Sequence, residues 1–374
     1  MNRKLLIGAS IILTQLLYAE NTLLEEVDGY LRFGYQNGAD GAEDIALGGK
    51  LHLQTGEWQG IVAGISVYTT NPIGSHDGAG MVFFDADHNA YSTLGEVYLK
   101  LNYGKNRLKV GRQEIDTPYA DTDDNGMIPN RFEAAVFTNN DIDDLTITLA
   151  YLTKMAGVDA EVPETFTDIG MNEGIPAVGI SYESNENVAM QGWVYNIKDR
   201  MGDRVFTYTD IVYNGSMEEY IAYEISGQYT TQEAIDGDAT IYGISGALNM
   251  IPIGLTLSTA YNKVEGSAAS NGFGGGPFFT SSEHLTLIEG GEDAKAVYLS
   301  VEFDAGRLGM EGLTLLGSYL KMDSAANTSA KETDWVANYA PNDQWSFDIF
   351  FSDIDDNING DTYQNTRFFV NYMF

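Results

Sequence analysis

The C-terminal segment, residues 364–374, is the most regular alternating stretch in the sequence. In an extended chain its apolar side chains fall on one side, at Phe368, Val370, Tyr372 and Phe374. The terminus of a soluble domain is usually polar and frayed. A terminal strand this apolar therefore predicts a partner, and pairing with the first strand would close the sheet into a barrel without edges. The last strand of an ordinary β-sandwich is the alternative.

Stretches of about ten alternating residues, separated by turns, recur along the rest of the chain. Alternation with a period of two is typical of strands that have one apolar and one polar face. We place eighteen strands, an even number as in single-chain bacterial barrels. Sixteen strands remain an alternative, because strand boundaries inferred from sequence are approximate. The expected strands are 29–37, 44–54, 58–68, 93–103, 106–112, 131–138, 144–153, 175–183, 187–195, 204–214, 219–229, 238–249, 252–263, 294–303, 312–321, 332–338, 344–352 and 364–374.

The connections between these strands alternate between short and long. Short ones include 55–57, 104–105 and 250–251, and the longest are 69–92, 113–130, 154–174 and 264–293. Transmembrane barrels have short turns on the periplasmic side and longer loops outside, whereas a soluble sandwich has no reason to keep this alternation. The predicted fold class is therefore all-β, a transmembrane antiparallel barrel with a long loop after the fifth strand.

Residues 1–19 have the three parts of a secretory signal peptide. Arg3 and Lys4 give the positive start, residues 5–17 are apolar, and Ala19 ends a plausible cleavage motif. We expect this segment to be removed, which leaves one domain over residues 20–374. The chain contains no cysteine, which argues against a disulfide scaffold in an exported protein.

The chain is strongly acidic, with a formal net charge of −34. This charge disfavours nucleic acid as a partner and favours cations. Charges more than about 8–10 Å apart are screened in physiological salt. The acids and bases at the narrowest point of a pore should therefore decide ion selectivity, and the total charge should matter less.

Three segments of this chain, 108–118, 127–133 and 145–151, resemble the outer-membrane porin D (OprD-like) family. The match is close over 93–155, and elsewhere the likeness lies in the leader, the strand number and the terminal phenylalanine. The resemblance implies an eighteen-stranded bacterial porin whose third outside loop folds into the lumen as a constriction. By analogy with porins it also implies a homotrimer in the outer membrane, in contact with lipid.

The loop 113–130 is the third outside loop and is rich in carboxylates. If it folds inward, as the resemblance implies, a ring of acids would attract cations. A solvated outside loop is the alternative. The predicted constriction acids are Glu114, Asp116, Asp121, Asp123 and Asp124, with Glu133 in the strand that follows.

Strand parity places a set of basic residues on the polar, lumen-facing side. These residues come from strands that become neighbours when the barrel closes. We hypothesise a basic wall opposite the acidic loop, with a field across the pore, which is similar to the arginine–lysine ladder of the family. Structural pairing, such as Arg131 with Glu133, is the alternative. The predicted basic residues are Arg32, Lys50, Lys100, Arg107, Lys109, Arg131 and Arg367.

The segment 121–126 matches the start of a calcium-binding loop, D-x-D-x-N-G. The twelfth position is Phe132, where an EF-hand has glutamate, so an EF-hand is not expected. A calcium site of another type remains open, with Asp121, Asp123 and Asn125 as ligands. No other cofactor is expected.

No catalytic residues are predicted. The histidines are scattered without metal-ligand spacing. The glycine-rich segment 272–277 lacks the lysine of a phosphate-binding loop and suits a flexible outside loop. The predicted function is an outer-membrane porin for passive diffusion of small hydrophilic solutes and ions, with a preference for cations. A barrel enzyme, and an adhesin or structural barrel with a plugged lumen, are the alternatives.

Overall fold

The computed structural model describes residues 23–38, 41–80, 82–184, 187–199, 202–234 and 237–374. The predicted signal peptide, 1–19, lies outside these described residues. Within the described ranges, no helix is both long and apolar enough to cross a membrane.

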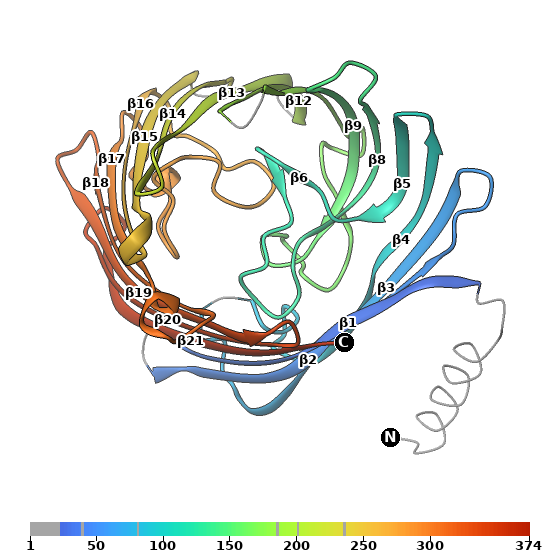
Figure 1. Ribbon diagram of the computed structural model, residues 1–374, viewed down its shortest axis with the longest axis horizontal. Helices are drawn as coiled ribbons and strands as arrows, with labels where there is room; N and C mark the ends of the chain where they lie inside the picture. The colour runs from blue at the N-terminus through green and yellow to red at the C-terminus, as the bar shows by residue number, and fades with distance from the viewer. Residues whose placement is uncertain (1–22, 39–40, 81, 185–186, 200–201, 235–236) are drawn as a thin grey trace.

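Over the residues that the structure describes, eighteen antiparallel strands form a closed ring around a central lumen (Figure 1). A further short strand, β10 (Thr167–Asp168), pairs with the end of β9. The barrel strands are β1 (Leu24–Asn37), β2 (Glu43–Thr55), β3 (Ile61–His76), β4 (Tyr91–Tyr103), β5 (Asn106–Gln113), β8 (Arg131–Asn139), β9 (Leu145–Ala156), β11 (Ile175–Ser184), β12 (Val188–Asp199), β13 (Gly202–Met217), β14 (Ile221–Gln232), β15 (Ala239–Met250), β16 (Leu255–Gly266), β17 (Lys295–Asp304), β18 (Leu313–Asp323), β19 (Ser329–Asn342), β20 (Trp345–Asp356) and β21 (Asp361–Met373).

The first and last strands close the barrel. β1 pairs with β21 from Tyr30 opposite Met373 to Asn37 opposite Thr366. The terminal Phe374 extends this pairing, because it exchanges two backbone hydrogen bonds with Gly29, of 3.0 and 3.1 Å. The prediction from the C-terminal segment is confirmed, and the sandwich alternative is wrong.

Each of the eighteen predicted strands corresponds to a strand of the barrel. Several strands are longer than predicted, and β3 continues to His76 where the sequence pattern ends near residue 68. Beyond the apolar band both faces of a strand can be polar, so the alternation disappears although the backbone pairing continues.

The outward face of the barrel is apolar. On β4 the side chains of Val97, Leu99 and Leu101 are exposed on the outside, whereas Tyr98 between them is buried on the lumen side. This alternation matches the predicted parity and suits a wall with lipid outside and water inside.

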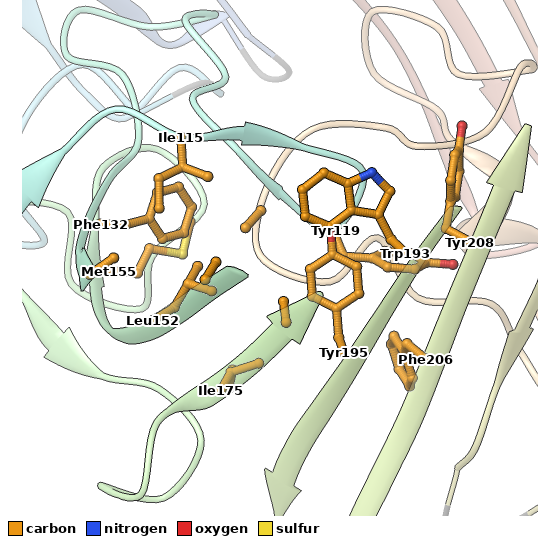
Figure 2. Close-up of a cluster of buried hydrophobic side chains, with 14 residues drawn as sticks. Ile115, Tyr119, Phe132, Leu152, Met155, Ile175, Trp193, Tyr195, Phe206 and Tyr208 are labelled. Atoms are coloured by element: carbon orange, nitrogen blue, oxygen red, sulfur yellow. The ribbon is translucent and has the colours of Figure 1, made fainter. Parts of the chain in front are cut away.

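The lumen is not uniformly polar, because long loops fold inside and bury apolar side chains against the wall. Figure 2 shows one such cluster, in which Ile115 and Tyr119 of the third loop lie against the wall. The ring of Tyr119 packs edge-on against Tyr195 and Phe206, with both centroid distances at 5.4 Å. In the segment 187–195 the lumen-side residues Trp193 and Tyr195 are aromatic and covered by a loop, so this strand does not alternate cleanly between apolar and polar residues.

The connection between β16 and β17, residues 267–294, also enters the lumen (Figure 1). Its Phe278, Leu285 and Leu287 belong to a second buried cluster against the wall. The backbone of Phe273 donates a 2.8 Å hydrogen bond to the carbonyl of Tyr119 in the third loop. The expectation of a free outside loop at 272–277 is therefore wrong, because this segment packs against the constriction loop.

Candidate functional site: the third loop and the lumen wall

The third loop lies inside the barrel, as the resemblance implied. It contains a small hairpin, in which β6 (Asp116–Thr117) pairs with β7 (Ala120–Asp121). Figure 1 shows β6 within the ring of strands. At the hairpin tip Tyr119 is fully buried, and its hydroxyl accepts a 2.9 Å hydrogen bond from Gln232 of β14. The loop thus reaches from β5 to a distant part of the wall and narrows the lumen.

Arg32 of β1 holds the C-terminal half of this loop. Its guanidinium donates two hydrogen bonds to the carboxylate of Asp124, of 2.7 and 2.8 Å. It also donates to the carbonyl of Gly126 at 2.9 Å and to Asn371 of β21 at 2.7 Å. A two-pronged arginine–carboxylate pair fixes orientation as well as distance. Arg32 therefore serves to position the loop, and its charge is compensated.

Arg367 of β21 contacts two loops at once. It donates a 3.3 Å hydrogen bond to the carbonyl of Asn125 in the third loop. It also forms an ion pair with Glu283 in the long loop before β17. Its side chain is 1% exposed, so this cation is compensated by the loops and does not face open solvent.

Lys50 of β2 lies between two carboxylates, at 3.0 Å from Glu114 and 3.3 Å from Glu96. The hydroxyl of Tyr68 donates a further 2.9 Å hydrogen bond to Glu114. Burial alone would raise the pKa of Glu114, but the contacts with Lys50 and Tyr68 outweigh it, so the pKa is lowered. Glu114 is therefore a charged but paired acid.

The remaining acids of the loop have no basic partner within the described part of the chain. Asp116, Asp121 and Asp123 form no ion pair there, in contrast to Asp124 and Glu114. Burial raises the pKa of Asp121, and Asp116 adds to the shift. Burial and repulsion from neighbouring carboxylates raise the pKa of Asp123 to about 7. The loop therefore carries carboxylates that no protein cation neutralises.

The other predicted basic residues occupy varied surroundings. Lys109 lies 4.0 Å from the ring centroid of Tyr98, and Lys100 donates a 3.2 Å hydrogen bond to Gln54. Arg131 is fully buried, with its guanidinium carbon 4.3 Å from the ring centroid of Tyr68.

Arg107 is exposed on β5, next to Asn102 and Thr138 in the strand register. Taken together, the basic residues do share one stretch of wall. Arg32, Lys50 and Arg367, however, pair with carboxylates directly, where the hypothesis had them facing an acidic loop across open space.

Glu133 is not a constriction residue. The register places it opposite Arg112, on the same outward side of the sheet as Val110. It lies 3.6 Å from Arg112 and 3.8 Å from Lys154. Strand parity placed Arg131 and Glu133 on one face, but Arg131 stacks on Tyr68 on the lumen side while Glu133 faces outward, so the alternation does not hold across the first residues of β8. The suggested pair with Arg131 does not form either.

The proposed calcium ligands lie in the third loop near one another in sequence. The side-chain amide of Asn125 donates a 2.8 Å hydrogen bond to Asp123, so Asn125 presents its nitrogen to that carboxylate. Over the described ranges, Asp121 and Asp123 do not belong to any group of three acids or histidines close enough to share a metal. The calcium site stays a prediction.

Sequence reasoning missed the part that the long loop 267–294 plays in this site. Its length and its glycine–proline segment were the only signals. With the third loop it bounds a cavity of about 260 Å³ on the lumen side of β12 and β13. The residues around this cavity are Asp116, Thr117, Pro118, Asp121, Gln191, Tyr208, Gly274, Gly276 and Pro277.

The family model for outer membrane porins of the OprD family matches residues 74–342. This chain belongs to the OprD family of outer membrane porins. No curated protein sequence matches it. Solved structures agree in fold. OpdK of Pseudomonas aeruginosa, solved with vanillate, superposes with a TM-score of 0.80 at 15% identity, over 93% of this chain and 98% of that one.

Other OprD-family structures are equally similar to this porin. OccK8 (OprE) of Pseudomonas aeruginosa gives a TM-score of 0.78 at 15% identity, over 93% of this chain and 98% of that chain. A BenF-like porin from Pseudomonas fluorescens Pf-5 gives a TM-score of 0.78 at 18% identity, over 94% of this chain and 99% of that chain. The chain is thus a channel of the bacterial outer membrane, in a family whose members pass small hydrophilic solutes.

Proposed function

We propose that this porin passes small hydrophilic solutes and ions by passive diffusion and prefers cations. The observation that carries this proposal is the division of the third-loop acids into two classes. Glu114 and Asp124 are paired with Lys50 and Arg32, whereas Asp116, Asp121 and Asp123 have no basic partner among the described residues. Rings of unpaired carboxylates favour cations in a pore.

The basic residues of the lumen wall reduce the preference for cations less than their number suggests. Arg32, Lys50 and Arg367 each lie within 3.0 Å of a carboxylate oxygen, so their fields are largely cancelled at the constriction. A carboxylate solute, such as the vanillate named for OpdK, would here meet unpaired acids on the loop. The acidic loop therefore supports cationic or neutral solutes.

Two partner assignments remain part of this proposal. The exposed apolar band, which includes Leu99, Val178 and Ile244, supports direct contact with the lipid of the outer membrane. A homotrimer rests on analogy with other porins alone, and light scattering on detergent-solubilised protein would measure the number of chains.

The test is a planar-bilayer recording across a salt gradient, with the combined variant Asp116→Asn, Asp121→Asn and Asp123→Asn. We expect a stable conductance in the wild type and a reversal potential toward cations. In the variant the cation preference should fall, because the unpaired charges are lost while the side-chain shapes are kept.

The matched control removes the same number of charges from exposed short turns, by Glu218→Gln, Glu219→Gln and Asp343→Asn. This control should leave the reversal potential unchanged, since the charges are screened from the constriction. Equal shifts in both variants would remove the loop from the mechanism. A folded barrel with no conductance would favour a plugged lumen.

A further inference from the structure

A row of polar side chains crosses the lumen wall at the end of the barrel where the connections are short. Asp28 of β1 lies directly opposite His52 of β2 in the strand register. His52 lies opposite Ser66 of β3, and Ser66 lies opposite Glu96 of β4. Residues paired in this way share one face of the sheet and stand close enough to interact.

Three side chains at one end of this row could hold a metal ion. Glu26, Asp28 and His52 each offer a ligand atom, and these atoms all lie within 4.8 Å of one another. One carboxylate oxygen of Asp28 is buried and has no hydrogen-bond partner. Across the described chain, neither Glu26 nor Asp28 forms an ion pair with a lysine or arginine. The carboxylates therefore converge without a protein cation to compensate them.

The imidazole of His52 is held in one orientation. Its Nδ1 lies 2.8 Å from the hydroxyl of Ser66, and that hydroxyl donates its proton to Glu96. Because a hydroxyl has one proton, Nδ1 must donate to Ser66, and the neutral ring then carries its lone pair on Nε2. Tyr98 stacks on the ring with an interplanar angle of 20°. Metal-binding histidines typically have this second hydrogen bond.

The nearby lysines do not occupy the converging atoms. Lys50 is paired with Glu96 and Glu114, and Lys100 donates to Gln54. The amide of Gln54 in turn donates a 2.7 Å hydrogen bond to Glu26, which holds that carboxylate toward the group.

We propose that Glu26, Asp28 and His52 bind a divalent transition-metal ion of the zinc class on the lumen wall. One imidazole nitrogen and two carboxylates are a donor set that suits zinc, with water in the remaining position. Calcium takes oxygen ligands and is not favoured by the imidazole. The site is separate from the third loop, and binding does not depend on which solutes the channel passes.

The experiment is a calorimetric titration of folded protein in detergent with Zn²⁺, in excess Ca²⁺ to occupy the many surface carboxylates. We expect one Zn²⁺ per chain. His52→Gln and Asp28→Asn should each weaken binding by about 10-fold or more. The control His76→Gln changes an exposed histidine on β3, far along the strand from the site, and should bind as the wild type does.

Ser66→Ala tests the positioning of the ring separately from the ligands. It should keep one Zn²⁺ per chain but lower the affinity by about 10- to 100-fold. Folding of each variant is verified by its gel mobility before and after boiling. Wild-type binding that Ca²⁺ abolishes, or that is unchanged in both His52→Gln and Asp28→Asn, would overturn the proposal. If the wild-type channel shows no cation selectivity in bilayers, that result would count against the proposed function and would leave the zinc proposal unaffected.

Discussion

At the scale of single residues, the net charge at the constriction depends on which third-loop carboxylates are paired with a lysine or arginine. Arg32 neutralises Asp124 through two hydrogen bonds, and Lys50 neutralises Glu114. Asp123 has different electrostatic surroundings. It is buried near the carboxylates of Asp121 and Asp159, which raises its pKa to about 7. The charge of Asp123 should therefore change near neutral pH.

The cation preference of the pore should increase as the pH rises from about 6 to about 8. Asp123 is protonated below a pKa of about 7, so it adds negative charge to the constriction only above that pH. The measurement is the reversal potential across a salt gradient as a function of pH.

Asp123→Asn should remove this pH dependence and leave the selectivity near its acidic value. A pH profile that is the same in this variant would show that another group titrates. The same raised pKa means that the folded state binds the proton more tightly than the unfolded chain, so the contribution of Asp123 to stability falls as the pH rises toward 7.

At the scale of elements, the third loop is held at its tip and along its length. Tyr119 packs among Tyr195, Phe206 and Tyr208, and its hydroxyl reaches β14. Gly274 of the long loop has a φ of 110°, and a Cβ there would lie 2.5 Å from the Asn130 side chain. Only glycine fits this close approach. The two loops therefore form one packed unit inside the barrel.

Tyr119→Ala should release the tip of the third loop. Removing a buried aromatic ring costs about 3–5 kcal/mol in a packed core, and here that loss falls on the loop because the wall is held by its own strand pairing. We expect a larger and noisier single-channel conductance than in the wild type.

Tyr119→Phe is the matched control, because it keeps the ring contacts and removes only the hydroxyl. It should cost about 1 kcal/mol and leave the conductance close to that of the wild type. Equal conductance in Tyr119→Ala and the wild type would mean that the other contacts of the third loop are enough to hold it in place.

At the scale of the whole molecule, the register between the termini decides closure. Phe374 contributes the last two backbone hydrogen bonds between β21 and β1, both to Gly29. Its ring is half exposed on the outside of the barrel. The contribution of the Phe374 backbone to barrel closure can therefore be measured separately from the contribution of its ring.

Deleting Phe374 should reduce the yield of folded barrel more than Phe374→Ala does. The deletion removes both closing hydrogen bonds, whereas the alanine variant keeps the backbone and loses only part of an apolar contact. The measurement is the folded fraction after refolding into detergent, judged by gel mobility without boiling. Similar yields for the two variants would assign the effect to the aromatic ring.

The barrel could be predicted because each strand and turn is recognisable from its own short stretch of sequence. Period-two alternation and the spacing of the turns are written in each strand, and so eighteen strands and their closure followed from the sequence. The inward position of the third loop came from the resemblance to the family. The pairs Arg32–Asp124 and Lys50–Glu114 were not predicted, since they join a loop to strands far away in the sequence.

Two features of the lumen wall could not be read from strand parity. Glu133 was assigned to the lumen, but the alternation is lost within the first residues of β8 and its side chain faces outward. His52 is far from other metal-ligating residues in the sequence, and its closeness to Asp28 and Glu26 follows only from the strand register. Pairing across strands depends on the residue offset between them, and the sequence pattern fixes each offset only to within a few residues.

The two arginines that hold the third loop lie on the strands that meet at the seam of the barrel. Arg32 is on β1 and Arg367 is on β21, the first and last strands in chain order. Strands β1 to β5 pair in sequence order, so Arg32 can reach the third loop before the barrel closes, but Arg367 is on the other side of the seam until β21 pairs with β1. The narrow passage is therefore completed late in assembly, after the chain has been inserted and sealed, and an unsealed intermediate would be a wider and less selective opening in the membrane.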